Sequence, residues 1–320
     1  NIPCNVSPEV VNELFSVAQA GGIIPDITLD RTLNDFLSLN SSEVLSQQYL
    51  GIQRSLPPER LASYNQDLAT TFGPGAQVPF GGVGIVALAL SLFLEVLAHE
   101  NTADPIKRIF GADHSTDIGT LVSEYLKQVP RVANDSQKMA EVPRVANDSQ
   151  KMAEVTERYD RALTYELMDY FEEMTIDRRI SSAGMKQWLN GAAFHLHLRI
   201  HQVRMGTHKQ GSAESLGVFY KFGIPGLFKT YTDYLQRNAR ETPPGSRPGV
   251  LVVEPSRNIT HRVQHRPCES EGIANMMVRK VLEVQGLQRT VDFFEETGKH
   301  IESLINQRGN FSLLSKVLTE

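Results

Sequence analysis

The three longest regular segments of the sequence repeat their apolar residues at the spacing of an α-helix. They span residues 150–178, 184–205 and 270–307. In the last segment the spacing stays close to a heptad a/d pattern, which Lys280 and Gly298 interrupt. Amphipathic segments of this length bury one face against each other, so we expect them to form the core of an antiparallel bundle. Their apolar positions are Met152, Tyr159, Leu163, Leu167, Tyr170 and Met174, then Met185, Trp188, Leu189, Ala192, Leu196, Ile200 and Val203, then Met277, Val284, Leu287, Val291, Phe294, Ile301 and Ile305.

Shorter segments with the same spacing predict further helices. They are 8–20, 29–50, 58–72 and 116–128, and Asp104-Pro105 begins another short helix. Residues 243–268 differ, because two runs rich in β-branched residues there predict a short β-hairpin or an extended loop. Strands and helices do not alternate along the chain, which argues against a parallel α/β sheet.

We therefore predict an all-α fold for residues 1–320 as a single helical domain. Its architecture is an elongated antiparallel helical bundle with several long helices and one short β-hairpin or extended loop. Residues 243–268 form a non-helical insertion in this prediction.

One stretch of the sequence is duplicated without change. Residues 129–141, VPRVANDSQKMAE, recur at 142–154. Pro130 and Pro143 disfavour an unbroken helix through both copies, and a single repeat of this length cannot stack into a solenoid. The segment 129–154 is interpreted either as a duplicated exposed loop or as an artefact of sequence assembly.

Several features favour a secreted protein. The N-glycosylation motif Asn-X-Ser/Thr occurs more often than the asparagine content would give by chance. The chain opens Asn1-Ile2-Pro3-Cys4 without an initiator Met, as expected after removal of a signal peptide. Glycans on exposed loops are therefore predicted at Asn5, Asn40, Asn134, Asn147, Asn258 and Asn310.

Composition limits the cysteine chemistry and the partners. The two cysteines, Cys4 and Cys268, can form one disulfide between the N-terminus and the last long segment, or remain two unpaired thiols. The net charge is −5 and the basic residues are scattered, so nucleic acid is not expected as a partner.

Residues 68–94 contain no charged side chain and end in an apolar run, Phe80–Leu94. As a helix this run spans about 22 Å, which is short of the hydrocarbon core of a bilayer. A helix that is apolar on all sides is buried, either in the centre of a bundle or in a membrane. The second alternative is a segment released for insertion, with the preceding glycines as a hinge. Its candidate residues are Phe80, Val83, Ile85, Leu88, Leu90, Leu92 and Phe93.

Aromatic residues cluster around Gly223-Ile224-Pro225-Gly226, where we expect a helix break. The cluster is a candidate wall for a ligand pocket between helices, and the alternative is simple packing at a helix corner. The candidate ligand-binding residues are Phe219, Tyr220, Phe222, Phe228 and Tyr231.

The sequence contains no recognisable catalytic, metal or cofactor motif. His197 and His201 are four residues apart on one helix, but two nitrogens do not make a metal site, and we expect surface or hydrogen-bonded histidines. Gly82–Ala87 fits a dinucleotide fingerprint without the required βαβ context. We predict no catalytic residue, no metal and no cofactor.

Three stretches resemble uncharacterised secreted helical proteins of bony fish, some of which are labelled as similar to the cephalotoxin of cuttlefish. The stretches are GGVGIVALALSLFLEVL at 81–97, LVSEYLKQV at 121–129 and KQWLNGAAFH at 186–195. The resemblance implies an extracellular, helical, toxin-like protein and assigns no functional residue.

Together these features predict a secreted N-glycosylated helical-bundle protein that acts by binding rather than by catalysis. The expected partner is a protein or an apolar small molecule. The alternative is a membrane-active, toxin-like defence protein that inserts the apolar helix 80–94.

Overall fold

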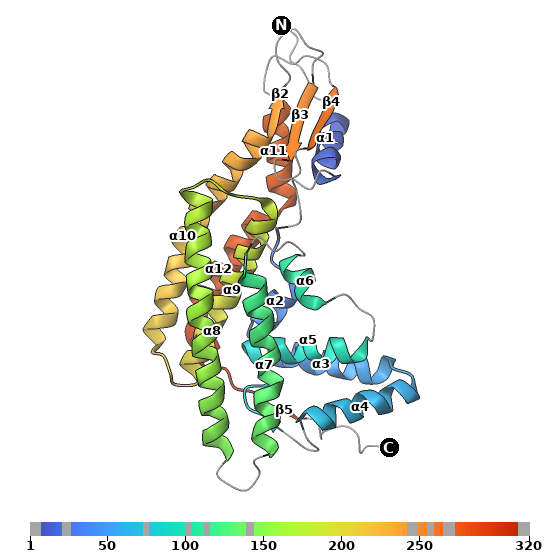
Figure 1. Ribbon diagram of the computed structural model, residues 1–320, viewed down its shortest axis with the longest axis vertical. Helices are drawn as coiled ribbons and strands as arrows, with labels where there is room; N and C mark the ends of the chain where they lie inside the picture. Colours follow the sequence, from blue (N-terminus) through green and yellow to red (C-terminus); the bar gives the residue numbers. More distant parts are fainter. Residues whose placement is uncertain are drawn as a thin grey trace. The chain divides into compact units, whose positions relative to one another are not determined.

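A computed structural model describes most of the chain (Figure 1). The described residues are 8–20, 27–72, 77–99, 104–111, 116–138, 144–241, 249–254, 259–264 and 273–312. Their fold is all-α, with helices α1 to α13 and short antiparallel strands. The predicted all-α fold and short β-hairpin are therefore confirmed.

The chain packs into two compact units, where we expected one helical domain. Unit 1 comprises the described residues within 1–28, 170–186 and 221–292. Unit 2 comprises those within 29–169, 187–220 and 293–320. The bounds of four helices include residues of both units: α8 (Arg144–Thr175), α9 (Ser182–Arg204), α10 (Gln210–Asn238) and α12 (Leu287–Lys299).

Unit 2 begins with two helices where the sequence predicted one over residues 29–50. The Asp30 carboxylate accepts a hydrogen bond from the Thr32 amide at 2.8 Å, which caps a short first helix. The chain then turns so that Phe36 and Leu37 are buried. The other helices contained wholly in this unit complete its frame. Together they are α2 (Arg31–Phe36), α3 (Ser41–Ser55), α4 (Pro58–Phe72), α5 (Gly84–Ala98), α6 (Pro105–Phe110), α7 (Ile118–Lys138) and α13 (Ile301–Asn306).

Helix α5, which carries the apolar run, lies within unit 2 against α2, α3, α4 and α7. Every side chain from Ile85 to Leu92 is buried, while Phe80 and Phe93 are half-buried. The part of the helix from Ile85 to Leu92 is thus buried on all sides by protein, as expected of a core helix. Of the helices that the structure describes, none is both long and apolar enough to cross a membrane.

The glycines before α5 allow close packing. A Cβ on Gly81 would lie 2.6 Å from the Phe311 Cβ, and a Cβ on Gly82 would lie 2.5 Å from the Ser42 hydroxyl oxygen. The short strand β1 (Gln77–Val78) pairs with β5 (Phe311–Ser312) beside them. These tight contacts explain why glycine occupies both positions, and a hinge is not needed to explain it.

Helix α9 is deeply buried in unit 2. From Gln187 to Arg204 every residue is buried except Arg199 and Val203, which are half-buried. Neighbouring helices run antiparallel to it, since the Trp188 indole N–H donates to the Leu167 carbonyl of α8, and Arg199 meets Asp160 further along. The predicted antiparallel packing of 150–178 against 184–205 is therefore observed here.

Unit 1 combines helices with a three-stranded antiparallel sheet. The sheet order is β2 (Ala239–Glu241), β3 (Gly249–Glu254) and β4 (Ile259–Gln264). Helix α1 (Pro8–Ala20) packs against β3, β4 and α11 (Ile273–Val284), and α11 also contacts β2 (Figure 1). The hydroxyls of Ser182 and Tyr231 lie 2.9 Å apart in this unit. The β3–β4 pair is the hairpin predicted within 243–268.

Two sequence predictions differ from the structure. The duplicated segment is helical rather than a loop in its described part, since 129–138 end α7 and 144–154 begin α8. The expected continuous run over 270–307 is broken into α11, α12 and α13. Its breaks fall at Gln285-Gly286 and at His300, whereas Gly298 lies inside α12.

We predict that Leu90→Ala destabilises the protein by about 2–5 kcal/mol, because Leu90 is fully buried in α5 and its truncation leaves a cavity. The control is Val96→Ala on the same helix, which is 51% exposed and should change stability by at most about 0.5 kcal/mol. Free energies of unfolding from urea denaturation measure both effects. Equal losses in the two variants would contradict the core position of α5.

Candidate functional site

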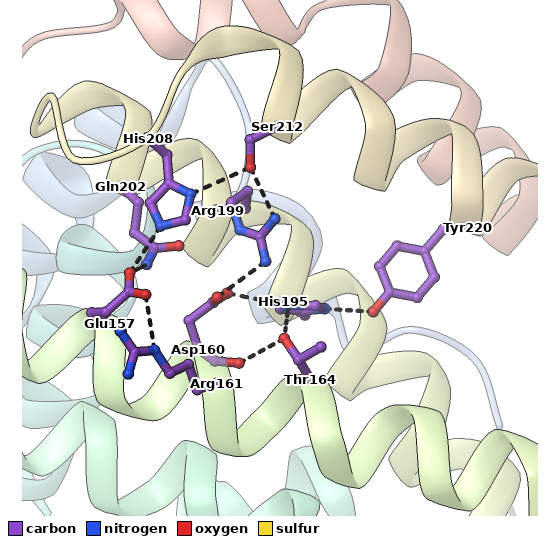
Figure 2. Close-up of polar contacts among 10 residues, drawn as sticks. All are labelled: Glu157, Asp160, Arg161, Thr164, His195, Arg199, Gln202, His208, Ser212 and Tyr220. Atoms are coloured by element: carbon purple, nitrogen blue, oxygen red, sulfur yellow. Dashed lines mark hydrogen bonds and ion pairs between the residues drawn. The ribbon is translucent and has the colours of Figure 1, made fainter.

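Polar side chains of α8, α9 and α10 meet inside unit 2 (Figure 2). Residues four positions apart lie on the same face of a helix. In an antiparallel pair, two such residues on one helix can therefore lie opposite two such residues on the other. Asp160 and Thr164 of α8 thus face His195 and Arg199 of α9. The ten residues drawn are Glu157, Asp160, Arg161, Thr164, His195, Arg199, Gln202, His208, Ser212 and Tyr220.

The inner part of this site centres on His195, which is fully buried. Its Nε2 lies 2.8 Å from the Thr164 hydroxyl and 3.1 Å from Asp160 Oδ1, and its Nδ1 lies 2.6 Å from the Tyr220 hydroxyl. The Thr164 hydroxyl donates to the Asp160 backbone carbonyl at 2.7 Å. It therefore accepts from Nε2–H, which leaves Nδ1 to accept from Tyr220. We name Asp160, Thr164, His195, Arg199 and Tyr220 the buried polar network.

Arg199 connects this network to α10. One guanidinium nitrogen donates to Asp160 Oδ2 at 3.0 Å, and another donates to the Ser212 hydroxyl at 2.9 Å. The Asp160 side chain is only 5% exposed. A carboxylate this deeply buried is stable as an anion only with a close cationic or hydrogen-bonding partner, which Arg199 provides at Oδ2.

The outer part of the site centres on Glu157. Its Oε2 accepts hydrogen bonds from Gln202 and from the His208 ring, both at 2.8 Å. Its Oε1 pairs with Arg161 Nε at 3.1 Å. The Glu157 side chain is 32% exposed and that of Arg161 is 76% exposed, so the site passes from a dry interior to the surface over one turn of α8.

The pKa values follow these surroundings. Burial alone raises the pKa of Asp160, but its contacts with His195 and with the charged Arg199 guanidinium outweigh this effect, and the net pKa is lowered. Burial lowers the pKa of His195 more than Asp160 raises it, which keeps the ring neutral. The hydrogen bond from His208 lowers the pKa of Glu157, with help from Arg161 and against partial burial. Both carboxylates are therefore ionised at neutral pH.

The buried polar network does not have the geometry of a nucleophilic triad. In a triad the carboxylate and the nucleophile contact opposite nitrogens of the histidine. Here Asp160 and the Thr164 hydroxyl lie at the same nitrogen, and the hydroxyl already donates its proton to a backbone carbonyl. The arrangement orients side chains and fixes helix packing rather than activating Thr164.

A hollow of about 860 Å³ opens at the outer part of the site. Glu157, Arg161 and His208 connect it to the residues of Figure 2. Three further lining residues belong to the second copy of the duplicated segment. We call this the α8 hollow, lined by Gln150, Ala153, Glu154, Glu157, Arg158, Arg161, Thr207 and His208.

The predicted aromatic ligand-binding residues differ in their exposure to solvent. Tyr220 and Tyr231 are fully buried, whereas Phe222 is 76% exposed. Phe219 is exposed and Phe228 is half-buried. Helix α10 continues through Pro225, so the expected helix break is absent from this described helix. Tyr220 instead contributes its hydroxyl to the buried polar network.

The predicted glycosylation sites have different environments. Asn40 and Asn310 are exposed, the first just before α3 and the second just before β5. Asn134 and Asn147 lie in α7 and α8 rather than in loops. Asn5, Asn258 and both cysteines, Cys4 and Cys268, lie outside the described residues.

The histidine pair on α9 is buried, contrary to the expectation of surface or hydrogen-bonded rings. His197 and His201 are each 1% exposed, and their ring nitrogens have no hydrogen-bond partner in the described part of the chain. Burial, with a smaller effect of the Arg204 charge, lowers the pKa of each to about 3. Among the described residues no group of three or more His, Cys, Asp or Glu could hold a metal ion.

Sequence reasoning missed Asp160, His195 and Arg199. Their signal was the four-residue spacing of Asp160 and Thr164 on one predicted helix and of His195 and Arg199 on the next. Such spacing is also common on solvated helix faces. Only the antiparallel packing of α8 against α9 shows that these faces meet.

We predict that His197 makes the protein less stable in acid. The unfolded ring has a pKa of about 6.5, whereas the folded ring has a pKa of about 3. Between these values only the unfolded state binds the proton, so stability is full above about pH 6.5 and falls by about 1.4 kcal/mol per pH unit below it. Urea unfolding of His197→Gln at pH 7 and pH 5 should show about 2 kcal/mol less acid loss than wild type.

The control for this prediction is His300→Gln, because the His300 side chain is 50% exposed. Its acid loss should match that of wild type. An acid loss for His197→Gln that is as large as in wild type would contradict the neutral, buried state of His197.

Neither a protein-family model, nor a curated protein, nor a solved structure matches this chain.

Proposed function

We propose that this chain is a secreted, N-glycosylated helical protein that acts by binding a protein partner at the α8 hollow. The observation that carries this proposal is the fixed position of the charged groups at that hollow. Glu157 is held by Gln202 and His208 as well as by Arg161. Groups that are already oriented lose less conformational entropy when a partner binds.

The lining of the hollow favours a polar partner. It carries two carboxylates, Glu154 and Glu157, two guanidinium groups, Arg158 and Arg161, and the His208 ring. A peptide segment with both acidic and basic side chains complements such a surface, whereas an apolar small molecule would remove water from these charged groups and offer no hydrogen bond in return. Of the two binding hypotheses, a protein partner and an apolar small molecule, the charged lining of this surface supports the protein partner.

Secretion and glycosylation are part of the same proposal. Exposed Asn40 and Asn310 are accessible acceptors, and the resemblance to secreted fish proteins supports an extracellular location. Protein secreted from cultured animal cells should lose mass on enzymatic deglycosylation, and Asn40→Gln should lose less. Secreted protein without glycan mass would contradict this part of the proposal.

The membrane-active alternative is the lesser hypothesis. It rests on the apolar run Phe80–Leu94 and on the resemblance to toxin-like proteins. Its seven candidate residues lie in or just before α5, where five of them are buried: Val83, Ile85, Leu88, Leu90 and Leu92. Insertion would require these residues to leave the core of unit 2, so their packing supports a core role.

A library of randomised peptides displayed on phage tests the binding function directly. Peptides selected on the glycosylated wild-type protein should bind Arg161→Glu at least about tenfold more weakly, a loss of about 1.4 kcal/mol. The Arg161 side chain is 76% exposed, so the substitution should leave the fold intact. Dissociation constants from interferometry or calorimetry measure the effect.

The matched control is Arg179→Glu, since Arg179 is 71% exposed and lies in unit 1, outside the hollow. It should bind the selected peptides as wild type does. Selection of no peptide, or equal binding by Arg161→Glu and wild type, would overturn the proposed binding surface.

A further inference from the structure

Three polar residues of α9 form a second cluster in unit 2, separate from the buried polar network. His197, His201 and Arg204 are spaced four and three residues apart, so they share one face of the helix. Each is nearly inaccessible, with exposures of 1%, 1% and 6%. Burial, and to a smaller extent the Arg204 charge, lowers the pKa of both histidines.

Arg204 is a buried cation without a counterion in the described residues. Its Nε donates to the Leu304 carbonyl at 2.8 Å, and Nη2 donates to the Gln307 side-chain oxygen at 3.0 Å. Its Nη1 has no hydrogen-bond partner there. Buried charges in proteins are normally paired, because an unpaired charge in a dry interior costs several kcal/mol. Among the described residues, Nη1 therefore lacks a hydrogen-bond acceptor and the guanidinium as a whole lacks a counterion.

The free end of Arg204 lies against the amino end of α5. A Cβ on Gly84, the first residue of α5, would collide with Nη1 of Arg204. Gly84 has φ +56, a conformation that glycine adopts without strain. Because glycine has no Cβ, the guanidinium can lie directly against its backbone. The guanidinium and the first turn of the helix thus adjoin with no side chain between them.

The amino end of α5 itself lacks a side-chain cap. The N-cap position is Val83, which has no acceptor to offer. The Gly84 amide donates to the Ser41 hydroxyl at 3.3 Å, but the next amides, of Ile85 and Val86, lie in the first turn and have no intrahelical acceptor. The end of a helix of 15 residues also carries a partial positive charge. Two positive groups, Arg204 and this helix end, therefore meet in the interior.

The Phe80 ring, in the turn before α5, contacts two further side chains that carry N–H donors. Its ring lies edge-on to His201, with 5.8 Å between centroids, and the Arg308 guanidinium lies 5.5 Å above it. Phe80 has φ 57, an uncommon conformation for a bulky residue that clusters at functional sites. The turn before α5 is thus held between His201 and Arg308.

We propose that unit 2 binds a small monovalent anion, of the size and charge of chloride, between the Arg204 guanidinium and the amino end of α5. Arg204 Nη1 and the first free amides of α5 donate to the anion, and His201 supplies a further N–H. Arg308 is exposed, so the buried positive charge is that of Arg204 together with the partial charge of the helix end, which matches a monovalent anion better than a divalent one. The site is buried and tightly packed, which favours a spherical ion over a larger organic carboxylate. The anion would neutralise Arg204 and anchor α9 to α5.

Bromide tests this site without any substitution. Bromide replaces chloride in such sites and scatters X-rays anomalously. Crystals of the full chain grown with sodium bromide should give an anomalous difference peak in contact with Arg204 Nη1 and the first turn of α5. A map with no peak there, or with ordered water only, would overturn the proposal.

Chloride-dependent stability provides an independent test in solution. The melting temperature should rise with sodium chloride and saturate, relative to sodium gluconate at equal ionic strength, because ligand binding stabilises the folded state. Arg204→Lys keeps the charge but loses Nη1, so its apparent chloride affinity should fall at least about tenfold. Arg31→Lys, at a side chain that is 93% exposed, is the matched control and should behave as wild type. An equal chloride response in Arg204→Lys and wild type would contradict the site, and if that variant does not fold, the bromide map alone decides.

Discussion

The structure of unit 2 depends on the ion pair between Asp160 of α8 and Arg199 of α9. Helix α9 is buried almost throughout from Gln187 to Arg204, yet it carries many polar side chains. A polar helix is stable in a protein interior only if its neighbours satisfy those groups. Asp160 does this for Arg199, and Thr164 and Tyr220 do it for the two ring nitrogens of His195. Hydrogen bonding and apolar packing therefore select the same arrangement of α8, α9 and α10.

The need to satisfy polar side chains in the interior also connects the core of unit 2 with the proposed binding surface. Asp160 and Glu157 are neighbours on α8, but the first is dry and the second reaches the α8 hollow. The fixed position of the surface charge thus derives from groups in the core. At the other side of α9, Arg204 lacks such a carboxylate in the described chain, and the proposed anion would supply the missing negative charge.

The fold was largely predictable from apolar spacing, and the site was not. The helices over 150–178 and 184–205 follow from residues such as Leu163 and Leu196, because a period of 3.6 marks a buried stripe. The burial of α9 on all sides was not predictable, since polar residues such as His195, His197 and His201 are more often found on a solvated surface. The role of Gly81 and Gly82 was also hidden, because it depends on contacts with Phe311 and Ser42 from distant parts of the sequence.

A double-mutant cycle on Asp160→Asn and Arg199→Met measures the central interaction most directly. Free energies of unfolding of wild type, both single variants and the double variant give the coupling energy between the two side chains. Because Asp160 is buried, Arg199 is half-buried and both share partners with neighbouring residues, the coupling should be about 1–3 kcal/mol. Single-variant losses that add to within about 0.3 kcal/mol would contradict the view that this ion pair organises α8, α9 and α10.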